Sequence, residues 1–174
     1  MSLKIDRKES SNIEYPLCPE GGQAIVLADV IDMGVQTTKW GEKDQLQFRY
    51  LTTTTFPDPE NGEEKPFMLF ERASKSLYDG KGKSPNPSKI YARCKALTGK
   101  PPQYDADGKF DVEALIGQSL FADIAHSDPT PDGKIFANIA SVMPLPPSME
   151  PAEIPDWFQR QEEKSKEVDD APPF

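Results

Sequence analysis

The strand signal of this sequence is strongest in one run of ten residues, Gln23-Ala24-Ile25-Val26-Leu27-Ala28-Asp29-Val30-Ile31-Asp32. Most of its side chains are apolar and several are β-branched, which is typical of a buried strand. Gly34 follows closely and suits the turn at which such a strand ends. We therefore expect this run to form the first strand of a sheet.

A second strand is expected after a polar turn at residues 37–43. Leu46, Phe48 and Tyr50 alternate with Gln47 and Arg49, and alternation is the side-chain pattern of a strand. We expect Leu46 and Phe48 to face the core and Gln47 and Arg49 to face outward. Tyr50 is able to point either way.

A third strand is expected at residues 66–72, after a loop rich in proline and glycine. On this strand Phe70 and Arg72 share one face, opposite Phe67 and Leu69. If Arg72 faces a binding groove, Phe70 faces it too and offers a ring to a base. The alternative is that Phe70 belongs to the core.

The pattern then changes to that of a helix. Residues 85–97 place Ile90, Cys94 and Leu97 on one side of a predicted helix, and Gly99 is a suitable end for it.

Two more strands complete the predicted sheet. They are expected at residues 118–125 and 134–143, after a helical turn at residues 111–116, and Asp132-Gly133 suits a tight hairpin between them. Three strands, a helix and two strands is the order of an OB-fold, a partly open five-stranded barrel. A generic α+β sandwich is the alternative.

The domain organisation follows from these elements and from the prolines after residue 143. Proline lacks a backbone donor, so the prolines between residues 144 and 155 disfavour further sheet pairing. We expect a mainly β protein with one helix: an N-terminal arm at residues 1–21, an OB-fold barrel at 22–147 and a flexible acidic C-terminal tail at 148–174. Ile154, Trp157 and Phe158 could anchor one short turn of this tail on the barrel.

The charge of the chain is unevenly distributed. Overall, 29 acidic residues against 20 basic ones give a net charge of −9, which taken alone argues against a nucleic-acid partner. However, residues 72–100 hold eight basic residues and one acidic residue, whereas residues 150–174 hold eight acidic and three basic residues. We therefore expect one basic and one acidic side on the folded domain.

The sequence contains no pattern that indicates an enzyme. His126 is the single histidine and has no nucleophile motif beside it, and the glycine pattern of a phosphate-binding loop is absent. The spacing of Cys18 and Cys94 indicates neither a disulfide framework nor a zinc site. We expect no catalytic residue, metal or cofactor, and no run approaches the ~20 apolar residues of a membrane helix.

Binding to single strands without sequence preference needs cations for the phosphates and aromatic rings for the bases. The second and third strands and the loops beside them offer both. The candidate nucleic-acid-binding residues are Lys39, Trp40, Lys43, Gln47, Arg49, Tyr50, Phe70, Arg72, Lys75, Tyr78, Lys81 and Lys83.

The chain ends in a compact recognition motif, Asp169-Asp170-Ala171-Pro172-Pro173-Phe174. The Phe174 ring can enter an apolar pocket on a partner while a basic rim accepts the carboxylates, and the prolines reduce the entropy lost on binding. The candidate partner-binding residues are Asp169, Asp170, Pro172, Pro173 and Phe174.

This acidic ending in Pro-Phe resembles the tip of bacterial single-stranded DNA-binding proteins. The domain is similar to the OB-fold single-stranded DNA-binding proteins of tailed phages and prophages. The stretches that carry the second resemblance are Val30-Ile31-Asp32-Met33-Gly34, Ser76-Leu77 to Lys83-Ser84, and Phe136-Ala137-Asn138-Ile139 leading to Pro144-Leu145-Pro146.

The resemblance implies a protein that coats single-stranded DNA during phage replication or recombination in the cytoplasm of a bacterial host. Its tail would recruit replication or recombination proteins, and a homo-oligomer stays open. The main alternative is an OB-like adaptor of the replisome or recombination machinery that binds only proteins. An accessory nuclease is a third hypothesis.

Overall fold

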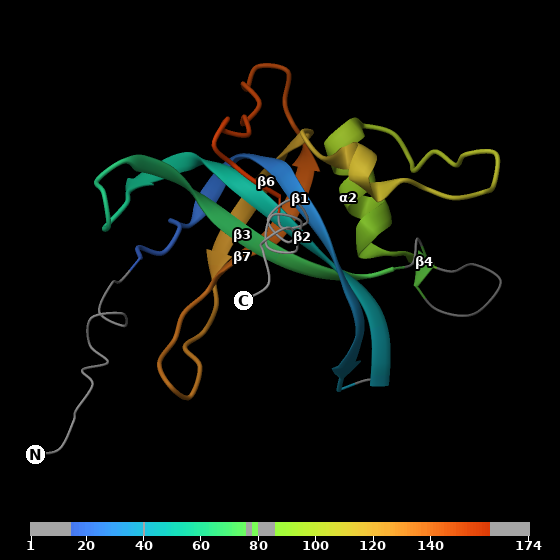
Figure 1. Cartoon of the computed structure of the whole chain (residues 1–174), viewed down its shortest axis with the longest axis horizontal. Helices are drawn as coiled ribbons and strands as arrows, with labels where there is room; N and C mark the ends of the chain where they lie inside the picture. Colours follow the sequence, from blue (N-terminus) through green and yellow to red (C-terminus); the bar gives the residue numbers. More distant parts are fainter. Residues whose placement is uncertain (1–14, 40, 76–77, 80–85, 161–174) are drawn as a thin grey trace, which may run out of the picture.

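The computed structural model describes residues 15–39, 41–75, 78–79 and 86–160 (Figure 1). Within these ranges the protein is mainly β with one α-helix. Its elements are β1 (Gly21–Thr38), β2 (Gly41–Pro57), β3 (Glu64–Ser74), β4 (Tyr78–Asp79), β5 (Asn86–Pro87), α2 (Lys89–Thr98), the 3-10 helix η1 (Val112–Leu115), β6 (Ser119–His126) and β7 (Ala137–Pro144).

The five expected strands are present, and β1, β2 and β3 are longer than predicted. They form one antiparallel sheet in the order β3-β2-β1-β6-β7. The two edges, β3 and β7, are not joined by strand pairing, so the sheet does not close. Figure 1 shows the long strands coiling strongly, with the end of the β1–β2 hairpin reaching beyond the other strands.

The predicted helix is confirmed, but it begins later than expected. Pro87 pairs with Tyr78 in the small β4–β5 sheet, and Ser88 caps the helix by accepting a hydrogen bond at its Oγ from the Tyr91 N–H at 3.4 Å. Gly99 ends the helix with a φ of 76°, a left-handed conformation that glycine adopts without steric cost.

The tight hairpin expected at Asp132-Gly133 is wrong. Strands β6 and β7 are joined by residues 127–136, whose ends meet through a hydrogen bond from the Ser127 N–H to the Phe136 carbonyl. Gly133 closes a turn within this connection by donating its N–H to the Thr130 carbonyl. A turn does form at Gly133, but it lies within a loop of ten residues and does not join the two strands directly.

The main core lies on one face of the sheet, called here the inner face. Ile25, Leu27, Phe48, Tyr50 and Leu120 are fully buried there. Helix α2 covers this face with Ile90, Cys94, Ala96 and Leu97, and η1 adds Leu115. The predicted inward position of Leu46 and Phe48 is confirmed.

A smaller core lies on the opposite, outer face of the same strands. Val26, Ala28 and Leu51 are buried there beside Ala152, with Met68, Ile154 and Phe158 packed around them. The Ser119 hydroxyl also donates to the Ala152 carbonyl at 3.1 Å. Residues 148–160, called here the C-terminal segment, were expected in the tail, with Ile154, Trp157 and Phe158 as possible anchors. Ile154 and Phe158 do pack on the sheet, whereas Trp157 is 57% exposed, so the packed part of the chain extends past Pro147.

The described part of the N-terminal arm also packs on the domain. The Tyr15 ring meets the Phe56 ring edge to face at 6.3 Å, and Cys18 is buried. The Cys18 carbonyl lies 2.7 Å from Nε2 of His126 at the end of β6. Among the described residues there is no helix with the length and hydropathy needed to cross a membrane.

Candidate nucleic-acid interface

Four of the predicted binding residues lie together on the outer face of β2 and β3. Gln47 pairs with Arg72 across the two strands, and Arg49 pairs with Phe70 two residues further along. Their neighbours in sequence, Phe48 and Leu69, point to the inner face and are buried. The four side chains therefore form one contiguous surface, called here the outer-face patch.

Side-chain contacts organise this patch. The Arg49 guanidinium carbon lies 5.3 Å from the centroid of the Phe70 ring, and Arg49 Nε donates to the Gln47 side-chain oxygen at 3.0 Å. Phe70 remains 52% exposed and Arg72 is exposed. Neither arginine makes an ion pair with another described residue, so both charges are available to an anion.

Lys43 extends the same face toward the tip of the β1–β2 hairpin. It lies four residues before Gln47 on β2, so alternation places both side chains on one face, about 13 Å apart along the strand. Lys39 lies in the hairpin turn and Lys43 lies just after it on β2, and both are exposed. Trp40, Lys81 and Lys83 fall outside the described residues, as do Asp169, Asp170, Pro172, Pro173 and Phe174, and for Tyr78 only the backbone is described.

Tyr50 is not part of the surface, and its predicted role is wrong. Its side chain is 0% exposed and packs edge to face against Phe48, with the ring centroids 6.3 Å apart. Burial, with the nearby Glu71 carboxylate, raises the pKa of its hydroxyl well above the ordinary value. Its even position on β2 gives it the same inward direction as Leu46 and Phe48.

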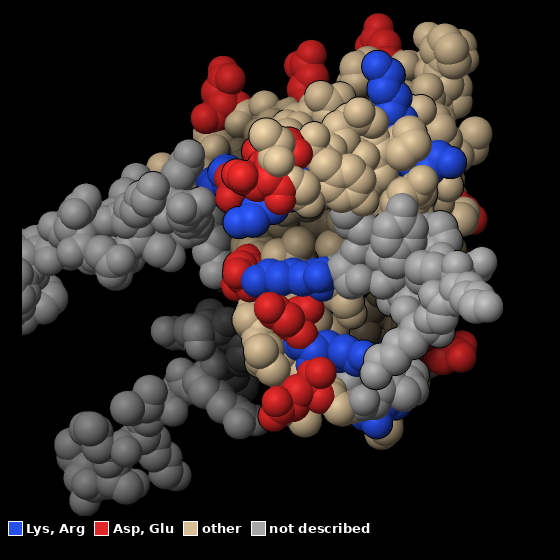
Figure 2. All heavy atoms as spheres, turned by 90° about the vertical axis from the view of Figure 1, so that its right-hand side faces the viewer, with Lys and Arg blue, Asp and Glu red and all other residues tan. Residues whose placement is uncertain are grey.

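The described part of the basic stretch at residues 72–100 does not form a uniformly basic face. Lys75 Nζ lies 2.6 Å from Asp32 and 3.3 Å from Asp44, and the hydrogen bond with Asp32 raises the pKa of Lys75. Arg93 makes two hydrogen bonds to Glu71 in a half-buried pair. Figure 2 shows acidic and basic side chains beside one another on the side of the molecule that it draws.

These ion pairs reduce the number of predicted cations that are available to a ligand. Lys75 is paired with acids of β1 and β2, and Arg93 is paired with Glu71 of β3. These acids lie outside residues 72–100, so the charge count of that stretch overstates the positive charge that a ligand meets. Lys75, expected to contact phosphates, is already engaged by two aspartates. Arg49 and Arg72 are therefore candidate cations of this face that make no ion pair with another described residue, whereas Lys81 and Lys83 lie outside the described residues.

One aromatic residue at this edge was not predicted as a binding residue. Phe136, just before β7, is 52% exposed and lines a small hollow of about 280 Å³ together with residues 67–70 of β3. It thus lies near Phe70 across the open edge between β3 and β7. A long loop between β6 and β7 would have indicated that Phe136 is exposed, but a tight hairpin was expected there.

A second feature that sequence reasoning missed is the anchor of the C-terminal segment. Arg160 Nε donates to Asp29 Oδ1 at 3.0 Å, and Arg160 Nη1 lies 3.3 Å from Glu113 Oε2. The Asp29 side chain is 1% exposed, and Asp29 pairs with Arg49 across β1 and β2. Arg160, the last described residue, is therefore held beside the outer-face patch. The sequence does not indicate this contact, because Arg160 and Asp29 are 131 residues apart.

The arrangement as a whole offers, on one surface of a sheet, an exposed ring, a hydrogen-bonding amide and two guanidinium groups that make no ion pair within the described part of the chain. Such a surface can hold phosphates through the arginines and stack a planar group on Phe70. Searches of protein-family models and of curated proteins find no match to this chain.

Proposed function

We propose that this protein binds single-stranded DNA without sequence preference across the outer-face patch. In this proposal it is an OB-fold protein of the phage or prophage type that coats single strands during DNA replication or recombination. Its acidic Pro-Phe ending recruits partner proteins of the same processes.

The order of the strands supports an OB-type barrel. The first strand pairs with the second and with β6, the helix follows the third strand of the main sheet, and β6 pairs with β7. An OB-fold has this succession, and its opening would lie between β3 and β7. The small hollow lined by residues of both edges fits a barrel that is open at this seam.

The observation that carries the proposal is the outer-face patch itself. OB-folds bind oligonucleotides on the face of their second and third strands, and here β2 and β3 present Gln47, Arg49, Phe70 and Arg72 on that face. Arg49 and Arg72 would hold successive phosphates. A base stacked on Phe70 would contribute about 1–3 kcal/mol whatever its identity, because every base has a flat face.

The test is fluorescence anisotropy of a labelled oligo-dT with the full-length protein over a series of salt concentrations. The logarithm of the binding constant should fall with the logarithm of salt concentration at a slope of about −0.7 for each phosphate contact. The double variant Arg49→Ala/Arg72→Ala should bind more weakly, and its slope should be shallower by about 1.4.

Lys95→Ala is the matched control for this test. It also removes a cation, but from the exposed side of α2, which covers the inner face. Its affinity and slope should stay close to those of the wild type. Equal losses for Lys95→Ala and the arginine variant would contradict a binding site on the outer-face patch.

The same measurement separates the alternatives. An adaptor that binds only proteins predicts no binding of oligo-dT at any salt concentration. A nuclease predicts that the oligonucleotide is degraded when a divalent cation is added. Either result would overturn the proposed function.

A further inference from the structure

A small hollow, called here the seam hollow, lies where the open sheet edges β3 and β7 approach each other. Residues 67–70 of β3 form one side of it, residues 136–138 form another, and residues 16–18 of the N-terminal arm complete the lining. Its volume is about 280 Å³, just below the usual range of about 300–1,000 Å³ for ligand pockets. The seam hollow therefore suits one small group rather than a whole cofactor.

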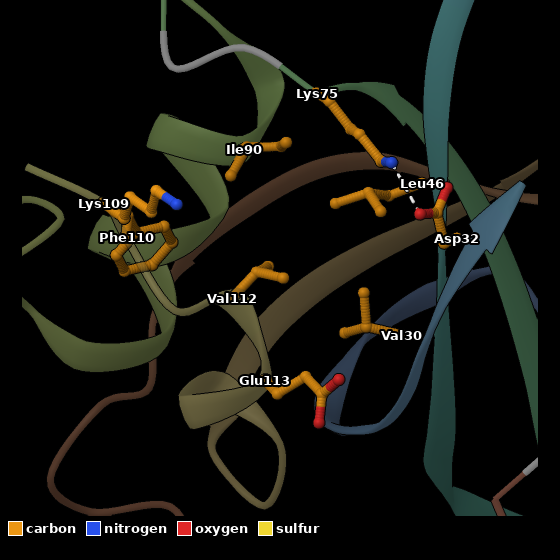
Figure 3. A pocket seen from close by; sticks show the side chains of 9 residues that line it. All are labelled: Val30, Asp32, Leu46, Lys75, Ile90, Lys109, Phe110, Val112 and Glu113. Carbon is orange, nitrogen blue, oxygen red and sulfur yellow. Dashed lines mark hydrogen bonds and ion pairs between the residues drawn. The ribbon is translucent and has the colours of Figure 1, made fainter. Parts of the chain in front are cut away.

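The larger cavity on the inner side of the sheet differs from the seam hollow in its charges. Figure 3 shows Lys75 directed at Asp32 there, and these two side chains form an ion pair. Glu113 also lines that cavity and is paired with Arg160. Because these charges already have partners, they select no ligand for the inner cavity.

Two exposed aromatic rings line the seam hollow. Phe70 and Phe136 are each 52% exposed. The backbone of Phe136 is fixed by Ser127, because the Phe136 N–H donates to the Ser127 hydroxyl at 2.9 Å and the Phe136 carbonyl accepts from the Ser127 N–H at 2.8 Å. The Arg49 guanidinium lies over the Phe70 ring. Rings that are held in place favour a flat ligand, since little ordering entropy is lost when it binds.

Asn138 adds a polar group to the seam hollow. Its neighbours on β7, Ala137 and Ile139, pack against the inner core, so alternation directs Asn138 outward, to the same side as Phe136. The Asn138 side chain is exposed, lines the hollow and makes no hydrogen bond with another described residue. Its amide therefore offers a ligand one acceptor oxygen and two N–H donors.

A flat ring with a hydrogen-bonding edge is the chemistry of a nucleobase. Adenine carries an acceptor, N7, beside the N6 amino donor, and an asparagine amide pairs with both at once. On the corresponding edge guanine carries two acceptors, thymine an acceptor and a methyl group, and cytosine a donor. On this edge adenine is therefore the base that matches the Asn138 amide.

We propose that the seam hollow binds one adenine of a bound strand, with the base between Phe70 and Phe136 and its N6 and N7 atoms on Asn138. The inference rests on the proposed function, since Arg49 and Arg72 of the outer-face patch hold the strand from which the base enters. Binding to the patch itself stays independent of sequence. The seam hollow adds a base preference at one position, so the protein favours registers that place adenine at the seam.

The test is competition against labelled oligo-dT on the full-length protein, measured by fluorescence anisotropy. The competitors are unlabelled oligo-dT and the same oligonucleotide with one central dA, dG or dC. The single dA should raise affinity about tenfold, the gain from one bidentate contact, and dG and dC should give smaller gains. Asn138→Ala should abolish this preference and leave the affinity for oligo-dT nearly unchanged.

Asn138→Asp sharpens the test, because a carboxylate accepts from N4 of cytosine and has no donor for N7 of adenine. The preference should therefore move from dA to dC. Ser141→Ala is the control: Ser141 is also exposed on β7 but does not line the seam hollow, so the dA preference should remain.

The aromatic side of the seam hollow has its own matched pair. Phe136→Ala should remove the gain from dA, whereas Ile135→Ala, which truncates the 44% exposed neighbour, should keep it. If oligo-dT binds through Arg49 and Arg72 but a single dA brings no gain, or if Asn138→Ala keeps that gain, this inference is overturned and the proposed function stands. Absence of binding to every oligonucleotide overturns both.

Discussion

The two ends of the outer face of β1, β2 and β3 differ in what covers them. At one end Val26, Leu51 and Met68 are apolar, and the C-terminal segment packs over them. The other end starts two residues further along each strand, at Arg49 of β2 and Phe70 of β3. The described chain does not pack over these side chains. One continuous sheet surface is thus core at one end and solvent-facing at the other.

This difference shows how a sheet face becomes a candidate binding surface. Apolar side chains recruit a segment of the same chain because covering them removes their surface from water. Covering the arginines and the glutamine of the outer-face patch would remove polar groups from water and would not be favourable. These side chains therefore stay accessible, with the Phe70 ring among them. The covered end should therefore govern stability, and the open end should govern binding.

Removal of a side chain from the covered end should give the largest effect. Leu51→Ala leaves a cavity beneath Ala152 and Phe158 and should lower the free energy of unfolding by about 2–4 kcal/mol. Arg72→Ala at the open end should change it by no more than about 0.5 kcal/mol. Urea denaturation measures both, and equal losses would show that the two ends do not differ as described.

The anchor between the two ends should give the next largest effect. Arg160→Ala leaves the buried Asp29 carboxylate without its guanidinium partner and should cost about 1–3 kcal/mol in unfolding free energy. Adding Asp29→Asn should recover part of this loss, because the uncompensated charge is then removed. Strictly additive losses in the double variant would contradict a direct Arg160–Asp29 interaction.

At the open end, Phe70→Ala should weaken binding of oligo-dT about tenfold, a loss of one stacked base. Its unfolding free energy should stay close to that of the wild type, because the ring is 52% exposed. Phe70→Tyr retains the ring and serves as the matched control. If Phe70→Ala bound as tightly as Phe70→Tyr, the patch would not hold bases in the proposed way.

The smallest effect concerns pH and belongs to the covered end. The hydrogen bond from Lys65 and the N–H of Glu60 lower the pKa of Asp58 from its ordinary 3.8, and Lys65 also lies over the Trp157 ring of the C-terminal segment. A lowered pKa stabilises the fold above the ordinary value, and this contribution is lost as pH falls through the folded-state pKa. Stability of the wild type should therefore fall more steeply below about pH 4 than that of Asp58→Asn.

Guanidinium denaturation at about pH 7 and about pH 3 would measure this difference. The two proteins should differ most at the higher pH and converge at the lower one. An equal pH dependence for both would exclude a stabilising role for the Asp58–Lys65 pair.

Much of the fold was predictable from local patterns. Alternation on β2 predicted the outward position of Gln47 and Arg49, and alternation on β3 placed Phe70 and Arg72 on one face. It left open whether that face was core, and the structure shows that both residues are exposed. Tyr50 obeys the same parity as Leu46 and Phe48, so its assignment to the binding surface is wrong and its ring is buried on the inner face. The end of helix α2 at Gly99 was also predictable locally, because glycine readily adopts the left-handed conformation that ends a helix.

The state of the charges depended on contacts between residues far apart in the chain. Lys75 is neutralised by Asp32 and Asp44 of the β1–β2 hairpin, and Arg160 reaches Asp29 across 131 residues. Side-chain direction on a strand repeats every two residues and can be read along the chain. Ion pairs and surface coverage arise only when the strands and the C-terminal segment meet in space, so these features required the three-dimensional structure.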